Sequence, residues 1–254
     1  MSIYAGSKPR EYRIFVPQKM LMTPIKRLRS YLREQSHTLR QLLHIGTPII
    51  LGQLGIISVN FADTIMVGKY STDALAAASF VNNIFALFFV LGLGFSYGLT
   101  PLVAKAHTHG DQLRLGRLLR HSTLLNLLIA FGLTLLLVGV YTFLELFRVP
   151  SDLLPLIRPY FILQMVSFGV YMASAALKQF FDGMGRTQVP MWIILSSNLL
   201  NVIGNYLLIF GKWGCPELGL YGAGLSTLLS RIYMLVALTL VLHYSRSFKV
   251  ISRA

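Results

Sequence analysis

Six long apolar stretches constrain the fold of this chain more than any other feature. They cover residues 42–67, 74–104, 122–144, 159–177, 187–211 and 218–242. Each is long enough to cross about 30 Å of hydrocarbon as a helix that rises about 1.5 Å per residue. Only Asp63 and Arg231 place a formal charge inside these stretches. We therefore predict an all-α integral membrane protein that folds as a six-transmembrane-helix bundle.

The composition agrees with a membrane protein. Hydrophobic residues make up 54% of the chain and charged residues 13%. A helix of a soluble domain carries a polar face at 3.6-residue spacing, and these six stretches mostly lack one. The composition therefore favours the lipid bilayer as the surroundings of this chain.

The basic residues report the orientation of the chain in the membrane. A formal net charge of +14 also occurs in nucleic-acid-binding proteins. Here, however, 18 of the 23 Lys and Arg residues lie before the first stretch, in the second and fourth loops or in the tail. The positive-inside rule then predicts a multi-pass protein of the cell (inner or plasma) membrane with both termini in the cytoplasm. We expect no nucleic-acid partner.

This topology divides the chain into three segments. Residues 1–40 are expected to form a basic cytoplasmic leader, residues 41–245 a transmembrane lobe, and residues 246–254 a cytoplasmic tail or truncated inter-lobe linker. In the leader, Ile25, Leu28 and Leu32 share one helical face beside several basic residues, a pattern that fits an interfacial helix. A disordered leader is the alternative.

Asp63 is the most unusual residue of the first stretch. A charge near the bilayer centre costs at least about 2.5 to 3.5 kcal/mol on insertion scales, so Asp63 should face protein or water. Gln53, Asn60 and Asp63 share one side of their helix. The later stretches carry polar groups at similar spacings, with Asn198, Asn201 and Asn205 in the fifth, and Thr227 one turn before Arg231 in the sixth.

Four of these polar side chains lie at similar depth. In the predicted topology, Asp63, Asn201, Asn205 and Thr227 all fall in the outer half of the bilayer, where they could converge on one ion-coupling site. A carboxylate with amide and hydroxyl oxygens suits a proton or a weakly held cation such as Na⁺. Removal from water disfavours the charged carboxylate, whereas a bound cation favours it, so the two ions would exclude each other. The alternative is that the Asn residues only bridge helices and Asp63 pairs with a basic residue.

Other features of the stretches fit architectural roles. Gln53, Asn60, Asn198 and Arg231 are candidates to line a polar cavity. For Arg231 we favour a structural role, in which it neutralises a carboxylate, meets backbone carbonyls or extends to the interface. Pro48 removes one backbone hydrogen bond from the first helix and is a candidate hinge. Gly94 and Gly98 lie four residues apart, a spacing typical of close helix contacts.

No enzyme motif emerges from the sequence. The chain lacks GxSxG, HExxH and P-loop patterns, and we expect neither an enzyme nor a cofactor other than the coupling ion, H⁺ or Na⁺. His107 and His109 lie in a basic loop without a carboxylate or cysteine beside them. We therefore expect no metal site beyond a possible Na⁺ at Asp63.

Four motifs resemble one transporter family. "HIGTPIILGQLGIISVNFADTIMVG", "LGFSYGLTPLVAKAHTHGD", "FFDGMGRTQVP" and "LLNVIGNYLLIFGKWGCPELGLYGAGLST" are similar to the N-terminal lobe of multidrug and toxic compound extrusion (MATE) transporters of the NorM-like type. The resemblance covers about residues 41–245. It implies a cation-coupled multidrug efflux antiporter that works by alternating access and exports amphipathic, often cationic, compounds.

The resemblance also assigns roles to individual residues. Asp63 matches the ion-coupling aspartate of the first helix, and Asn201 and Thr227 match the asparagine and threonine grouped with it. Asn205 falls where some members carry aspartate, and this departure leaves the choice between H⁺ and Na⁺ open. The alternatives are a lipid-linked precursor flippase of the same superfamily, and a non-transporting membrane subunit or membrane enzyme.

Members of this family have two six-helix lobes with the substrate cavity between them. The present sequence stops where a linker to the second lobe would begin. The expected partners are therefore membrane lipid, an amphipathic or cationic small molecule, and a second six-helix lobe. We favour a missing C-terminal half over a homodimer, which the even number of spans would also permit.

Overall fold

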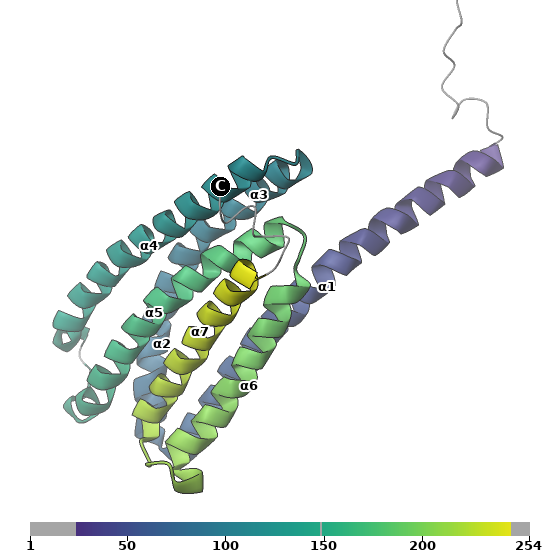
Figure 1. Cartoon of the computed structure of the whole chain (residues 1–254). Coiled ribbons are helices and arrows are strands. Elements are labelled where there is room, and N and C mark those ends of the chain that lie inside the picture. The colour runs from purple at the N-terminus through teal and green to yellow at the C-terminus, as the bar shows by residue number, and fades with distance from the viewer. Residues whose placement is uncertain (1–23, 148, 245–254) are drawn as a thin grey trace, which may run out of the picture. The chain divides into compact units, whose positions relative to one another are not determined.

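The computed structural model describes residues 24–147 and 149–244, which are almost entirely helical (Figure 1). Short 3₁₀ turns cover Leu144–Phe147, Ser151–Leu153 and Lys212–Gly214. The described residues contain no strand. The seven α-helices are α1 (Pro24–Tyr70), α2 (Thr72–Tyr97), α3 (Leu99–Thr108), α4 (Gln112–Thr142), α5 (Leu154–Gly183), α6 (Gln188–Phe210) and α7 (Gly219–Tyr244).

The prediction of six membrane spans is confirmed. Six helical segments are long and apolar enough to cross a bilayer: Leu42–Tyr70, Thr72–Thr108, Gln112–Thr142, Ser151–Gly183, Gln188–Phe210 and Gly219–Tyr244. Many large apolar side chains are exposed on them, among them Phe61, Leu87 and Phe131. Exposed apolar surface of this extent suits contact with lipid.

Most of the helices are longer than the apolar stretches, because polar residues continue the helix at its ends. Apart from α1, which begins at Pro24, the largest difference concerns α4, which begins at Gln112, inside the segment that we expected to be a loop. The Asp111 carboxylate caps α4 by accepting a hydrogen bond from the Arg114 backbone N–H at 2.9 Å. Hydropathy detects the part of a helix that contacts lipid and does not detect such a capped polar turn.

The expected second span consists of two helices, α2 and α3, that meet at Gly98. The predicted contact face of Gly94 and Gly98 is not formed in the described part of the chain, where a Cβ atom added at Gly94 would have no neighbour within 4 Å. The close approach lies at Gly92 instead. A Cβ atom there would lie 2.7 Å from the Met172 Sδ atom of α5.

The chain divides into two compact units between His44 and Ile45, so that the boundary lies within α1. In the first unit, the described residues 24–44 are helical, and they include the positions of Ile25, Leu28 and Leu32. The interfacial location of this segment stays a prediction. The other expected parts of the leader, residues 1–23, and the expected tail from residue 245 lie outside the described residues.

In the second unit, α5 is the central helix. It contacts α2, α3, α4 and α7, and Figure 1 shows it between α4 and α7, with α6 on the other side of α7. Phe85 of α2 packs edge-on against Phe161 and Phe168 of α5, with ring centroids 5.0 and 6.4 Å apart. All three rings are fully buried. Aromatic packing of this kind fixes α2 against α5.

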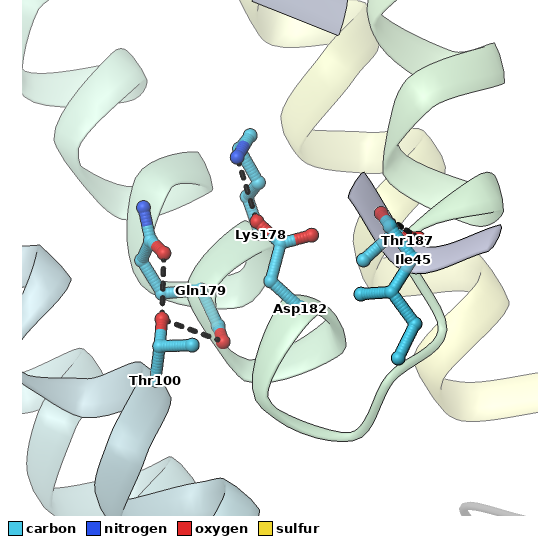
Figure 2. Close-up of polar contacts among 6 residues, drawn as sticks. All are labelled: Ile45, Thr100, Lys178, Gln179, Asp182 and Thr187. Atoms are coloured by element: carbon cyan, nitrogen blue, oxygen red, sulfur yellow. Dashed lines mark hydrogen bonds and ion pairs between the residues drawn. The ribbon is translucent and has the colours of Figure 1, made fainter. Parts of the chain in front are cut away.

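Polar contacts connect neighbouring helices around the C-terminal end of α5 (Figure 2). Thr100 of α3 donates a hydrogen bond to the Gln179 Oε1 atom at 2.8 Å. Lys178 and Asp182 form an ion pair of 2.7 Å along α5. Beyond the turn, the buried Thr187 donates to the Ile45 carbonyl oxygen of α1 at 3.1 Å. These contacts connect α1, α3 and α5 at one end of the bundle.

Candidate functional site

The four predicted ion-coupling residues lie together in a single hydrogen-bond network. Asn205 of α6 donates from Nδ2 to the Asp63 carboxylate of α1. The same Nδ2 group lies 3.2 Å from the Asn201 Oδ1 atom, and Asn201 donates to the Thr227 Oγ1 atom of α7 at 3.3 Å. The network therefore joins α1, α6 and α7 through Asp63.

The Asn201 amide fits its surroundings in two orientations. When it is rotated by half a turn, its nitrogen donates to the Asp63 Oδ1 atom at 2.8 Å and its oxygen accepts from the Thr227 backbone N–H at 3.3 Å. The amide thus connects Asp63 to α7 in this second orientation, and connects Asn205 to α7 in the first. In the second orientation the carboxylate therefore receives amide donors from both Asn201 and Asn205.

Asn205 contributes an acceptor as well as a donor. Its side chain is fully buried, and its Oδ1 atom has no hydrogen-bond partner among the described residues. A buried polar atom without a partner costs about 1–3 kcal/mol. An oxygen left open beside a carboxylate is suited to a cation or to a ligand that donates a hydrogen bond.

Close packing of α6 against α7 brings Asn201 to Thr227. Ser226 donates to the Asn201 backbone carbonyl at 2.8 Å, and Ser197 donates to the Ser230 carbonyl at 2.8 Å. Gly204 lies against Ser226 so closely that an added Cβ atom would be 3.2 Å from the Ser226 Cβ atom. Small residues therefore set the distance between these helices.

Asp63 lies on the walls of two adjoining cavities. The larger has a volume of about 470 Å³, and its polar wall includes Asn60, Asp63, Thr64, Asn82, Tyr160, Gln164, Thr227 and Arg231. The smaller, of about 90 Å³, extends toward Lys178 and is also lined by Gln53 and Asn198. The structure thus places all four candidate cavity residues, Gln53, Asn60, Asn198 and Arg231, on cavity walls.

Arg231 does not have the partners that we expected. Its Nη1 group donates to the Ser167 hydroxyl of α5 at 2.8 Å, and its Cζ atom lies 5.0 and 5.2 Å from the ring centroids of Phe89 and Tyr171. Among the described residues, no carboxylate or backbone carbonyl binds the guanidinium. The direct contacts of Arg231 are therefore a hydroxyl and two aromatic faces, its charge interacts with that of Asp63 without an ion pair, and its structural role stays a prediction. Asp63 likewise pairs with an amide and with no described basic residue.

Three polar residues of the larger cavity were not identified as candidates from the sequence. The Tyr160 hydroxyl of α5 donates to the Asn82 Oδ1 atom of α2 at 3.2 Å and accepts from the Gln164 amide at 2.8 Å. Tyr160 and Gln164 lie one turn apart in an apolar helix, which is a usable signal. Asn82 carries a similar signal, because it is an amide within a long apolar run.

Two further expectations concern Pro48 and metal ions. The buried Pro48 lies within α1, which continues as one helix from Pro24 to Tyr70, so a hinge at this residue stays a prediction.

The described part of the chain contains no group of three or more His, Cys, Asp or Glu side chains that could hold a metal ion. An ion at Asp63 would accordingly be held by one carboxylate together with neutral oxygens.

The sequence matches one family model and many named relatives. The model is MatE, which aligns with residues 48–207. A probable multidrug resistance protein NorM of Bradyrhizobium diazoefficiens is 32% identical over 209 residues, which cover 81% of this chain and 44% of that protein. A protein of the same name from Bacillus subtilis is 30% identical over 215 residues, covering 83% and 47%. The chain therefore spans less than half the length of these relatives.

Solved structures support the same fold at lower identity. The eukaryotic MATE transporter AtDTX14 aligns with a TM-score of 0.76 at 19% identity, over 88% of this chain and 48% of that one. An outward-facing multidrug resistance MATE family transporter of the MOP superfamily aligns with a TM-score of 0.73 at 18% identity, over 81% and 45%. At such identities the alignment establishes the six-helix fold alone.

Proposed function

The chain belongs to the MatE family, and from that premise we propose that its six spanning helices form the N-terminal lobe of a multidrug efflux antiporter driven by H⁺ or Na⁺. Because the chain spans 44% of a NorM relative, the complete transporter would also need a second six-helix lobe. In this proposal both termini face the cytoplasm and the membrane is the cell membrane.

One observation carries the proposal, namely that the Asp63 carboxylate receives a hydrogen bond from Asn205 at the wall of a cavity. A carboxylate at this depth can be neutralised by a proton or compensated by a cation, and the two forms exclude each other. Binding of a coupling ion would therefore change the charge that a substrate meets in the cavity.

The network also gives ion binding a mechanical consequence. The ionised Asp63 carboxylate accepts hydrogen bonds, whereas the protonated acid can donate one. A change of this kind would rearrange the bonds that Asn205 and Asn201 make between α1, α6 and α7. Such a rearrangement supports alternating access, because helix contacts favour discrete arrangements.

Both candidate ions fit the oxygen atoms of the site. Carboxylate, amide and hydroxyl oxygens come from Asp63, Asn205 and Thr227, and the Asn205 Oδ1 atom is without a described partner. A site with one formal charge and neutral oxygens would hold Na⁺ weakly, and weak binding permits release. The same carboxylate would accept a proton when no cation is present.

Ethidium accumulation in an efflux-deficient host tests the proposal. We would compare the chain, its Asp63→Asn variant and each of these fused to a second lobe. The matched control is Asp73→Asn, which removes an exposed carboxylate near the N-terminus of α2. We expect the fusion to lower ethidium accumulation, the Asp63→Asn fusion to restore it to the level of cells without a transporter, and the Asp73→Asn fusion to behave like the unaltered one.

Two results would overturn parts of the proposal. Full export by a well-expressed Asp63→Asn fusion would remove Asp63 from coupling. Equal accumulation in all well-expressed fusions and in the empty host would contradict multidrug export.

A further inference from the structure

The larger cavity contains a positive charge as well as a negative one. Asp63 of α1 and Arg231 of α7 both line this volume of about 470 Å³. Asp63 and Arg231, which both lie in the described part of the chain, form no ion pair with each other, although their charges interact at longer range. Each charge is therefore open to a ligand in the same cavity.

The guanidinium of Arg231 is held in place with most of its donors unused. Ser167 accepts one of its five N–H groups, at 2.8 Å, and no other described residue accepts a second. Phe89 and Tyr171 fix the group through their ring faces, at 5.0 and 5.2 Å from Cζ. A guanidinium held on its faces keeps its planar edge for a hydrogen-bond acceptor, and that edge matches a carboxylate or phosphate.

The walls around the two charges are largely aromatic. Phe85, Phe89, Tyr160 and Tyr171 line the same cavity. Its volume falls in the range of about 300–1,000 Å³ that is usual for sites of drug-sized ligands. A ligand with a flat apolar body would contact these rings while its polar groups reach Asp63 and Arg231.

A ligand with only a positive charge would compensate just one of the two charges in this cavity. It would meet an opposite charge at Asp63 and a like charge at Arg231, whose N–H groups would stay without an acceptor. A ligand that carries both an ammonium and an anionic group would compensate both residues. The cavity is thus complementary to a molecule with two opposite charges.

We infer that Arg231 is a specificity-determining residue that recognises the anionic group of a zwitterionic aromatic substrate, with Asp63 facing its cationic group. Ser167 is a positioning residue, because it orients the guanidinium. This inference rests on the proposed export function and narrows its substrate class.

Two dyes with the same skeleton test the inference. The first is a rhodamine that carries a free carboxylate beside its cationic ring system, and the second is the methyl ester of that dye, which is only cationic. Their affinities would be measured by fluorescence anisotropy with the purified full chain in phosphatidylglycerol nanodiscs. Arg231→Gln removes the guanidinium, and Arg231→Lys keeps the charge without the planar fork. Arg158→Gln, at an exposed ion pair with Glu145, is the matched control.

We expect Arg231→Gln to weaken binding of the carboxylate dye about tenfold or more, as for loss of a charge-assisted hydrogen-bonded pair. The ester should bind as well as before or more tightly, because a like charge is gone. Arg231→Lys should restore part of the affinity, and Arg158→Gln should change neither dye. Ser167→Ala should weaken binding of the carboxylate dye by about threefold and leave binding of the ester unchanged. If Arg231→Gln does not fold, the result for Ser167→Ala decides the test.

The outcomes separate this inference from the proposed function. Equal weakening of both dyes, or no change in either, overturns the role of Arg231. Binding of the ester alone by the unaltered chain also overturns it while leaving cationic export intact, and binding of neither dye by the chain or by its fusion to a second lobe contradicts both. If phosphatidylethanolamine displaces the carboxylate dye, the same pair of charges recognises a zwitterionic lipid headgroup.

Discussion

Asn205 of α6 donates a hydrogen bond to the carboxylate of Asp63 of α1, although 142 residues separate them in the sequence. This contact joins the first and fifth spans at the proposed coupling site. The donor is a neutral amide at a position where the family resemblance expects aspartate in some members. The network therefore contains a single formal negative charge, and a change at Asn205 should alter which ion binds.

Asn205→Asp should increase the affinity of the site for Na⁺. A second carboxylate beside Asp63 adds a like charge, and a cation relieves the resulting repulsion. We expect replacement of choline chloride by NaCl to stabilise this variant by on the order of 1 kcal/mol more than the unaltered chain, or about 2–4 °C in Tm. Thermal unfolding in detergent measures the difference.

Asn198→Asp provides the control, because Asn198 lies on the same helix and is not hydrogen-bonded to Asp63. An equal Na⁺ effect in both variants would assign the stabilisation to added negative charge in general. It would then count against a cation site formed by Asp63 and residue 205.

The contact of α6 with α7 should depend on Gly204. An alanine there would place its Cβ atom 3.2 Å from the Ser226 Cβ atom and closer still to the hydroxyl. Overpacking of this kind typically costs about 1–3 kcal/mol. We expect Gly204→Ala to lower the free energy of unfolding by that amount, and Ser226→Gly in the same chain to recover part of the loss.

Gly94→Ala is the matched control, since its Cβ atom would have no neighbour within 4 Å. Its effect should stay within about 0.5 kcal/mol, as is usual for surface positions. If Gly94→Ala destabilised the chain as much as Gly204→Ala, the assignment of the close helix contact to α6 and α7 would be wrong.

The ion pairs Lys178–Asp182 and Arg158–Glu145 should differ in their importance. The side chains of Lys178 and Asp182 are 19% and 6% exposed, whereas those of Arg158 and Glu145 are 51% and 74% exposed. Lys178→Met leaves a buried carboxylate without its partner, which typically costs about 3–5 kcal/mol. Arg158→Met breaks an exposed pair, which contributes about 0–1 kcal/mol.

Thermal or denaturant unfolding of both variants measures this contrast. Asp182→Leu together with Lys178→Met should recover most of the loss, because no unpaired charge stays buried. Equal effects of Lys178→Met and Arg158→Met would show that the Lys178–Asp182 pair is solvated in the membrane protein.

Much of the fold could be predicted from the sequence because the bilayer imposes long apolar helices. All six spans were found in this way. Hydropathy does not show where a helix ends, however, so the capped start of α4 at Asp111 was missed. Hydropathy also does not show where one helix ends and another begins within a single apolar stretch, so the division between α2 and α3 at Gly98 was missed.

The site was predictable to the extent that its residues are rare within apolar spans. Asp63, Asn201, Asn205 and Thr227 stood out for this reason. Their partners depend on how helices rotate and approach, which spacing within one helix does not fix. The small-residue pattern at Gly94 therefore indicated a contact that Gly92 makes instead, and the surroundings of Arg231 became visible only with α2 and α5 in place.

Cys215 allows the proposed orientation to be tested without an added label site. It is the only cysteine of the chain, and it lies in the turn between α6 and α7 that should face outward. A membrane-impermeant maleimide should therefore label it in intact cells. A Cys215→Ser, His109→Cys variant places the thiol at the exposed end of α3, and we expect its labelling only after permeabilisation. The reverse pattern would put Asp63 in the inner half of the bilayer, and a coupling ion would then have to reach it from the cytoplasm.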